Sequence, residues 1–365
     1  MPDASDVPFD DIEIIKQRKK EGIEIPLRRN VQAKTASTYL EYVKLVHNAL
    51  PELDYDDIDT STTFFKKRFL APIIIDSMTG GTDESNIINS RLGELAEKYG
   101  FGMGVGSQRA GLKSEELAAT YSIARKNAPN AFLIANIGGA QLAKGLAIDE
   151  AKRIVDMIRA NALVVHLNPL QELVQPEGEP RYKGVLDKIR DLVKAIDVPV
   201  IVKEVGAGIS KEVAIKLEMA NVSAINIAGA GGTSWAGVEK LRAESVKDEL
   251  KRHLGEVFWD WGIPTAVSLI EVRRAVKLPV IASGGLRNGV EVAKCIVLGA
   301  NMSAMAYPFL RAAAHSRESL FAFADMILAE LKSTMFLVGA ENISALASSR
   351  YILTGLLAHE VSTRT

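Results

Sequence analysis

The stretch AFLIANIGGAQLAKGLAIDEAKRIVDMIRANALVVHLN, residues 131–168, decides the predicted fold because it holds two apolar segments around a helical pattern. Residues 131–138 and 162–168 are continuously apolar up to their polar ends, which is typical of strands covered on both faces of a parallel sheet. Between them, residues 148–162 place apolar side chains at i, i+3 and i+4, the spacing of an amphipathic helix. The stretch therefore predicts a strand–helix–strand unit.

The same pattern recurs along the chain. The predicted strands begin at Ala71, Phe101, Ala131, Ala162, Pro199, Ser223, Pro279 and Met302. Further helical patterns lie at 88–100, 186–197, 211–222 and 289–300. The first four strands follow one another in steps of about 30 residues, the length of a strand–helix unit, without a linker. Eight such units predict an α/β fold, a (β/α)8 TIM barrel, in preference to a doubly wound sheet.

Two regions fall outside the repeat. Residues 1–70 are predicted as an N-terminal extension, with a basic cluster and a helix-like segment at 36–53, and residues 71–365 as the barrel, in one structural domain overall. The connection at 231–278, after the sixth strand, is predicted to be a long loop that carries all three tryptophans and serves as a lid or binding insertion. From Leu320 onward, helices are expected to close the barrel.

Composition limits the class of protein. Hydrophobic residues make up 47% of the 365 residues and charged residues 24%, as in ordinary globular proteins. The net charge of -1 argues against a general nucleic-acid or anionic-membrane surface. The single cysteine, Cys295, is expected in a helix that packs in the core. The acidic N-terminus lacks the apolar region of a signal peptide, and a cytoplasmic, soluble protein is predicted.

Polar or glycine-rich residues follow all eight predicted strands, and in a TIM barrel these ends meet at one rim that holds the site. The loops at 228–235 and 282–289 follow the sixth and seventh strands and are rich in glycine. Because glycine lets backbone N–H groups approach an anion closely, both loops predict a phosphate site, to which Thr233 adds a hydroxyl.

Cationic residues at the rim are the next candidates. Lys203 ends the fifth strand, and strand alternation directs it inward and Glu204 outward, although a structural Lys203–Glu204 ion pair is the alternative. Arg109, after the second strand, suits bidentate binding of phosphate, with an exposed helix start as the alternative. The basic run at 18–20 is by itself more typical of a solvated face.

The segment VVHLNPLQELVQPEGEP, residues 164–180, is apolar at first and then polar. His166 and Asn168 alternate in register and are expected to face the barrel mouth, and Gln171 and Glu172 follow the turn at Pro169. The segment lacks a hydroxyl or thiol nucleophile, so a polar binding site is predicted. Glu172 suits a hard divalent ion such as Mg²⁺ together with diphosphate oxygens.

Taken in order, six segments resemble the type 2 isopentenyl-diphosphate isomerase family. They are DSMTGGT (76–82), GMGVGSQR (102–109), HLNPLQE (166–172), QPEGEP (175–180), GAGGTSW (229–235) and DWGIPTA (260–266). The resemblance implies a flavoprotein of isoprenoid biosynthesis that interconverts isopentenyl and dimethylallyl diphosphate. It requires reduced FMN, with NADPH as reductant, and Mg²⁺, and has no net redox change. It also implies a homotetramer or homo-octamer whose N-terminal extension contributes to the active site.

The resemblance assigns roles to individual residues. FMN would be held by Ser77, Met78, Thr79, Ser107, Asn136, Lys203, Thr233, Gly284, Gly285, Arg287, Ala306 and Tyr307. The substrate would be held by Arg18, Lys19, Ser107, Gln108, Arg109, His166, Asn168 and Gln171, and the metal by Glu172. Gln171, His166 and Asn168 are the predicted catalytic group, in which Gln171 positions the alkene and reduced flavin acts as acid and base. The family usually has histidine where this chain has Gly22, which removes one diphosphate contact, and His47 is not an obvious replacement.

The sequence leaves two alternative functions open. The first is an FMN-dependent oxidoreductase on the same barrel, such as a 2-hydroxy-acid oxidase or a glutamate-synthase-like domain. Such oxidases need a histidine base near the flavin, and the loops after the sixth and seventh strands contain none. An enzyme resembling inosine-monophosphate dehydrogenase needs a loop cysteine, which Cys295 is not. The second is a non-catalytic flavin- or phosphate-binding regulator, against which the polar residues at all eight strand ends argue.

Overall fold

The eight predicted strands are all present and form a closed parallel barrel in the computed structural model, which describes residues 12–364. Around the barrel the order is β10-β11-β4-β5-β6-β7-β8-β9, so each strand pairs with its neighbours in the chain. The strands are β4 (Ile73–Ile75), β5 (Gly102–Gly104), β6 (Leu133–Gly138), β7 (Ala162–His166), β8 (Val200–Lys203), β9 (Ala224–Asn226), β10 (Val280–Ala282) and β11 (Met302–Met305). The predicted (β/α)8 TIM barrel is confirmed.

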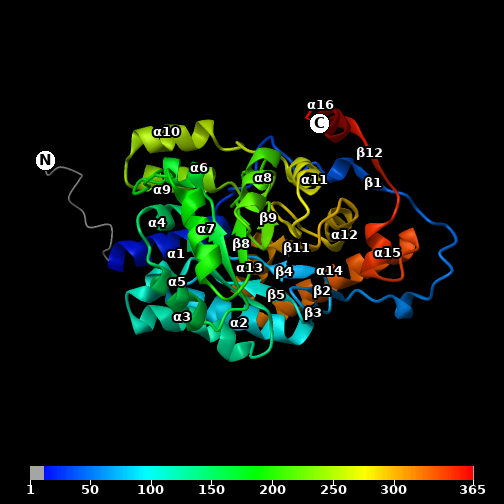
Figure 1. Ribbon diagram of the computed structural model, residues 1–365, viewed down its shortest axis with the longest axis horizontal. Helices are drawn as coiled ribbons and strands as arrows, with labels where there is room; N and C mark the ends of the chain where they lie inside the picture. The colour runs from blue at the N-terminus through cyan, green and yellow to red at the C-terminus, as the bar shows by residue number, and fades with distance from the viewer. Residues whose placement is uncertain (1–11, 365) are drawn as a thin grey trace, which may run out of the picture.

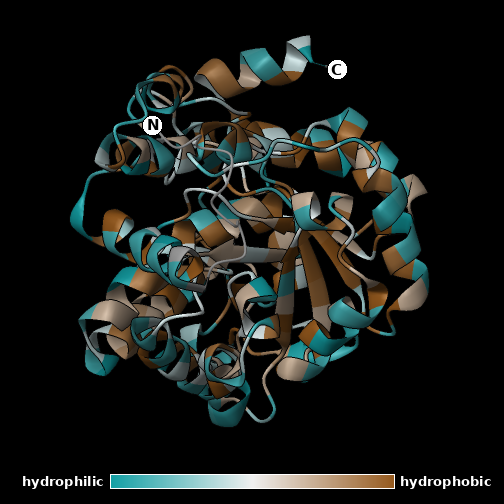
Figure 2. Cartoon of the chain, turned by 90° about the vertical axis from the view of Figure 1, so that its left-hand side faces the viewer, coloured by the Kyte–Doolittle hydropathy of each residue, from teal (hydrophilic) through white to brown (hydrophobic). Residues whose placement is uncertain are grey.

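Amphipathic helices surround the barrel, and all five predicted helical patterns lie in helices. The surrounding helices are α2 (Asp83–Tyr99), α3 (Glu115–Asn127), α5 (Ile148–Met157), α7 (Val185–Ala195), α8 (Lys211–Met219), α11 (Thr265–Ala275), α12 (Gly289–Val297) and α14 (Arg317–Val338), of which α2, α5, α7, α8 and α12 contain the five predicted patterns. In Figure 2 most of the visible strands are brown and the outer faces of many helices are teal, as expected when each helix buries one apolar stripe. Cys295 is fully buried in α12, as predicted.

The N-terminal end of the barrel is closed by aromatic side chains. A hairpin of β2 (Thr62–Phe64) and β3 (Lys67–Phe69) packs Phe64 and Phe69 against Phe132, which directly precedes β6. Above this plug, alternate strand residues such as Ile134 and Ile201 fill the interior. Only the opposite, C-terminal end is therefore left for a site.

The structure differs from the prediction in the extension. Residues 36–53 were expected to be helix-like, but they form a short 3-10 turn, η1 (Leu40–Tyr42), and a strand, β1 (Val43–Leu45). This strand pairs antiparallel with β12 (Tyr351–Leu353) near the C-terminus, at the side of the molecule away from α10 (Figure 1). The helical prediction is wrong because a partner strand about 300 residues away supplies the hydrogen bonds that the local pattern does not reveal.

The predicted long connection after the sixth strand is present and lines the cavity, but it is helical where a loop was expected. Residues 231–278 contain α9 (Trp235–Ser245), α10 (Glu249–Val257) and α11, with Ser234 and Asp248 capping the first two through their side chains. Figure 1 shows α9 and α10 together beside α6 (Pro169–Val174), and α9 packs on both. The insertion is thus a helical wall above the barrel mouth. At the chain end, α14, α15 (Ile343–Ala347) and α16 (Gly355–Thr363) confirm the predicted helices.

Helix α1 (Ile12–Arg28), which was not predicted, covers the C-terminal end of the barrel and contacts α9. Within the described part of the chain, no helix combines the length and apolar character needed to cross a bilayer.

Candidate active site

A cavity of about 230 Å³ opens at the C-terminal strand ends, between α1, α9 and the glycine-rich loops. It collects all predicted site residues except one. These are Arg18, Lys19, Ser77, Met78, Thr79, Ser107, Arg109, Asn136, His166, Asn168, Gln171, Glu172, Lys203, Thr233, Gly284, Gly285, Arg287, Ala306 and Tyr307. They come from α1 and from the ends of all eight barrel strands, which is the rim expected from the sequence.

Gln108 is the exception. Its side chain is fully buried behind the cavity wall, where Nε2 donates to the Ile154 carbonyl at 2.9 Å and Oε1 accepts from the Asn136 N–H at 3.0 Å. The prediction that Gln108 touches the substrate therefore differs from the structure, in which this amide holds the neighbouring strand. The η3 turn (Gln108–Leu112) rotates it inward, whereas Ser107 and Arg109 reach the cavity.

One end of the cavity is built from backbone. Gly284 and Gly285 have φ of 97° and 78°, a conformation that favours glycine. A Cβ on Gly284 would lie 2.1 Å from the Gly229 carbonyl oxygen, and one on Gly232 would lie 2.6 Å from the Gly285 Cα. Together with the start of α13 (Tyr307–His315), whose first N–H groups have no partner within the helix, this end suits an anion.

Two side chains flank this glycine end. The Arg287 guanidinium donates to Gln32 Oε1 at 2.6 Å, and Gln32 Nε2 donates to Thr233 Oγ1 at 3.2 Å. Gln32 belongs to the N-terminal extension, so a residue far away in the sequence orients the predicted phosphate ligands.

Lys203 lies at the base of the cavity and is 5% exposed. Its Nζ lies 3.5 Å from Asp76 Oδ2 and donates to the Glu204 carbonyl at 2.9 Å, and Asn226 Nδ2 donates to the same Asp76 oxygen at 3.3 Å. The Glu204 carboxylate points elsewhere and accepts the N–H groups of residues 205–207. The predicted alternation at the strand end is confirmed, and the alternative Lys203–Glu204 side-chain pair is not formed.

Cationic side chains crowd the opposite end. Lys19 Nζ donates to the Ser107 carbonyl at 2.9 Å, and burial, with smaller effects of Arg18 and Arg109, lowers the pKa of Lys19 to about 7. His166 Nδ1 lies 2.8 Å from Asn136 Oδ1, and burial, followed by nearby cations, lowers its pKa to about 3. This end therefore has excess positive potential, which a bound anion would relieve.

A chain of hydrogen-bonded amides and carboxylates forms the wall of the cavity between these two ends. Tyr182 donates its hydroxyl to Asn168 Oδ1 at 2.8 Å, and Asn168 Nδ2 donates to Gln171 Oε1 at 3.1 Å. Gln171 Nε2 donates in turn to Glu239 Oε1 at 2.8 Å. Glu172, 8% exposed, accepts the Glu179 N–H at 3.0 Å through Oε2. The amide of Gln171 is thus held from both sides.

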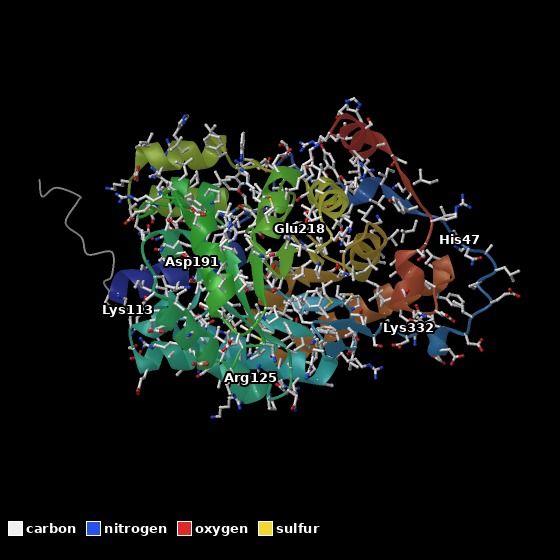
Figure 3. The ribbon with its side chains drawn as sticks, viewed as in Figure 1. His47, Lys113, Arg125, Asp191, Glu218 and Lys332 are labelled. Carbon is white, nitrogen blue, oxygen red and sulfur yellow. The ribbon has the colours of Figure 1, made fainter. Side chains whose placement is uncertain are left out.

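Several lining residues were not predicted from the sequence. They include Asp76, Gln141, Gln175, Trp235, Glu239 and Arg242. Asp76 had a signal, as the first polar residue after the first strand, whereas Glu239 and Arg242 lie in a segment that resembles any solvated helix. His47, the family position considered above, does not line the cavity and lies on the far side of the molecule from α1 (Figure 3, with α1 labelled in Figure 1).

The fold is shared with flavin oxidases. A mandelate oxidase superposes with a TM-score of 0.60 at 18% sequence identity, covering 94% of this chain and 98% of that chain. At this identity the likeness concerns the fold alone. Residues 140–353 match the FMN-dependent dehydrogenase family.

Closer relatives cover nearly the whole chain. The isopentenyl-diphosphate delta-isomerase of a Nostoc species is 47% identical over 92% of this chain and 95% of its own length. The enzymes of that name from Methanothermobacter thermautotrophicus and Archaeoglobus fulgidus are each 46% identical, over 94% and 93% of this chain and 94% and 96% of their own. The chain therefore belongs to the isopentenyl-diphosphate delta-isomerase family, isomerases built on the barrel of the FMN-dependent dehydrogenases.

Proposed function

We propose that this isomerase interconverts isopentenyl diphosphate and dimethylallyl diphosphate, with reduced FMN as acid and base and Mg²⁺ on the diphosphate. The observation that supports this most is the division of one cavity into a glycine backbone end and a cationic side-chain end, with Gln171 in the wall between them. Two anionic groups, a flavin phosphate and a substrate diphosphate, can then be held apart in the same cavity.

The residues fit FMN. The crowding at Gly232 and Gly284, where a Cβ would overlap backbone atoms, leaves a surface made only of main chain, as phosphate binding by N–H groups requires. Lys203, buried at the base of the cavity, would place a positive charge under an electron-rich ring. When bound, reduced FMN would supply the proton exchange with the two unreactive alkene carbons.

The residues also fit Mg²⁺, but only with help from the substrate. Within residues 12–364, no group of three His, Cys, Asp or Glu side chains is arranged to hold a metal ion by itself. Glu172 faces the cavity, and each of its carboxylate oxygens keeps a lone pair beyond the hydrogen bonds from Glu179 and Asn168. Magnesium is commonly held by one or two carboxylates and by substrate phosphates, so a diphosphate would complete the site.

The remaining side chains would bind and orient the substrate. Arg18, Lys19 and Arg109 would neutralise the diphosphate, and His166, held neutral in the free cavity, would become easier to protonate beside it. Gln171, fixed by Asn168 and Glu239, would align the alkene.

A flavin-dependent oxidoreductase is less well supported. His166 is the only histidine among the described lining residues, and it belongs to the fourth barrel strand, not to the loops after the sixth and seventh. Burial also lowers the pKa of His166 to about 3, which makes it a weak base. The shared barrel of mandelate oxidase does not transfer its chemistry. NADPH as reductant, a cytoplasmic location and a homotetramer or homo-octamer stay predictions from the resemblance.

An anaerobic assay with isopentenyl diphosphate, FMN, Mg²⁺ and NADPH tests the proposal. We expect conversion to dimethylallyl diphosphate without stoichiometric use of NADPH, and strong loss of conversion in Gln171→Ala and Glu172→Ala proteins that retain FMN. Full activity in either variant with FMN bound would contradict the site assignment. A colourless protein that takes up no FMN would contradict the function itself.

A further inference from the structure

Arg242 of α9, which has no role in the proposed function described above, is the centre of a buried ion cluster. Each of its three guanidinium nitrogens donates to a different carboxylate at 2.7 Å: Nε to Glu21, Nη1 to Glu239 and Nη2 to Glu177. The arginine side chain is 9% exposed and that of Glu239 is 2% exposed. Because all three nitrogens are engaged, the planar guanidinium can adopt only one orientation.

The three carboxylates come from three separate parts of the chain. Glu21 lies on α1, Glu239 lies one turn before Arg242 on α9, and Glu177 lies in the segment that follows α6. The cluster therefore fastens the helix that covers the cavity to the helical wall and to the loop below it. At the other end of this part of α1, Lys16 pairs with Glu116 of α3 across an exposed surface.

The cluster also reaches the predicted catalytic amide. Glu239 uses one oxygen for Arg242 and the other to accept from Gln171 Nε2 at 2.8 Å. Burial raises the pKa of Glu239, and the charge of Arg242 opposes that rise, so the arginine keeps this carboxylate an acceptor for the amide. An uninterrupted series of contacts runs from Glu21 through Arg242 and Glu239 to Gln171.

We propose that Arg242 is a positioning residue that couples the seating of α1 over the cavity to the orientation of Gln171. The inference rests on the proposed isomerase function and adds to it a mechanism that positions Gln171. When α1 is seated, Glu21 holds Arg242, Arg242 holds Glu239, and Glu239 keeps Gln171 in the orientation that would align the alkene. Since α1 also carries Arg18 and Lys19, the residues that would contact the diphosphate and the amide that aligns the alkene are brought into place together.

A double-mutant cycle between Glu21 and Gln171 tests this coupling, because the cycle measures an interaction between two residues that share no hydrogen bond. The variants are Glu21→Gln, Gln171→Asn and their combination, each purified with FMN and assayed for kcat and KM with isopentenyl diphosphate. Glu116→Gln and its combination with Gln171→Asn form the matched control, since Glu116 anchors the same helix but does not touch the cluster. Flavin absorbance and thermal unfolding confirm that each protein is folded.

We expect Glu21→Gln to lower kcat and raise KM, and its effect on kcat/KM to shrink by at least about fivefold once Gln171 is already changed. The Glu116 cycle should be multiplicative within about twofold. Arg242→Lys keeps the charge but loses the planar guanidinium that binds three carboxylates. It should therefore resemble Glu21→Gln in the same cycle. Multiplicative effects in both the Glu21 and Arg242 cycles would overturn the coupling. A wild-type protein that binds FMN but isomerises nothing would instead contradict the proposed function.

Discussion

The two ends of the cavity are built in opposite ways. The glycine end presents main chain from loops that each lie within about ten residues of a barrel strand, and its shape follows from the absence of side chains. The cationic end consists of long side chains brought together from α1, the second strand and the fourth strand. The first end should be intolerant of any added atom, whereas the second should respond mainly to changes of charge.

Gly284→Ala should have the largest effect. Its Cβ would meet the Gly229 carbonyl at 2.1 Å in a backbone with φ of 97°, so the loop must move away from the proposed position of the FMN phosphate. Losing two charged hydrogen bonds of about 1.5–3 kcal/mol each would weaken FMN binding by at least about 100-fold. Titration of the apoprotein with FMN, followed by flavin absorbance or fluorescence, measures the change.

Gly145→Ala is the matched control because Gly145 has nearly the same φ, 98°, but nothing within 4 Å of its Cβ position. It carries the same backbone strain without the crowding, and FMN affinity should change little. Equal loss of FMN in both alanine variants would mean that strain, and not the close approach of two loops, explains the glycine end.

Glu172→Gln comes next and acts on the wall of amides and carboxylates between the two ends. The neutral amide removes the charge that would hold Mg²⁺, so the Mg²⁺ concentration for half-maximal activity should rise at least about tenfold while FMN binding stays unchanged. Glu179→Gln serves as control, since the Glu179 carboxylate pairs with Lys144 at 2.8 Å and does not line the cavity. If both variants shift the Mg²⁺ requirement equally, Glu172 is not the metal ligand.

Lys19 should make anion binding depend on pH. With a pKa of about 7 in the free protein, it is charged below that pH and neutral above it, and a bound diphosphate favours the charged form. Relative to a Lys19→Arg protein, which stays charged, affinity for inorganic pyrophosphate should fall about tenfold from about pH 6 to about pH 8. Calorimetric titration of both proteins at each pH measures this difference. Parallel pH profiles would show that Lys19 keeps its charge throughout.

Gly22→Ala should have the smallest effect and completes the contrast between glycines. Gly22 lines the cavity inside α1, yet nothing lies within 4 Å of its Cβ position. Alanine should therefore stabilise the helix by about 1 kcal/mol without loss of FMN, in contrast to Gly284→Ala. Chemical denaturation of the FMN-bound protein gives the free energy of unfolding, and a decrease would mean that this end also is closely packed.

The same division explains what could be predicted from the sequence. The barrel strands and glycine loops were predictable because each is a local pattern, and so were the ligands directly after a strand, such as Lys203 and His166. Arg242 and Glu239 were not, because helix α9 shows an ordinary charged sequence and only the fold brings Glu21 against it. Gln108 was misplaced for a different reason, because a single turn decides whether its amide faces the cavity or the wall.

The N-terminal extension shows most clearly what cannot be predicted from the sequence alone. The segment at 36–53 had helical character by itself, but β12 pairs with β1 and makes part of it a strand. A single sequence contains no sign of which distant strand will pair, so local propensity was overridden by tertiary contacts.

The most direct test of the central claim, that one cavity holds a reduced flavin and a diphosphate without net redox change, is to count turnovers for each flavin reduction. The FMN-bound protein is reduced once, stoichiometrically and without oxygen, freed from reductant, and given excess isopentenyl diphosphate and Mg²⁺. We expect many molecules of dimethylallyl diphosphate per flavin, with the flavin still reduced at the end. Turnover that stops at one product per flavin, with the flavin oxidised, would contradict the claim and indicate an oxidoreductase.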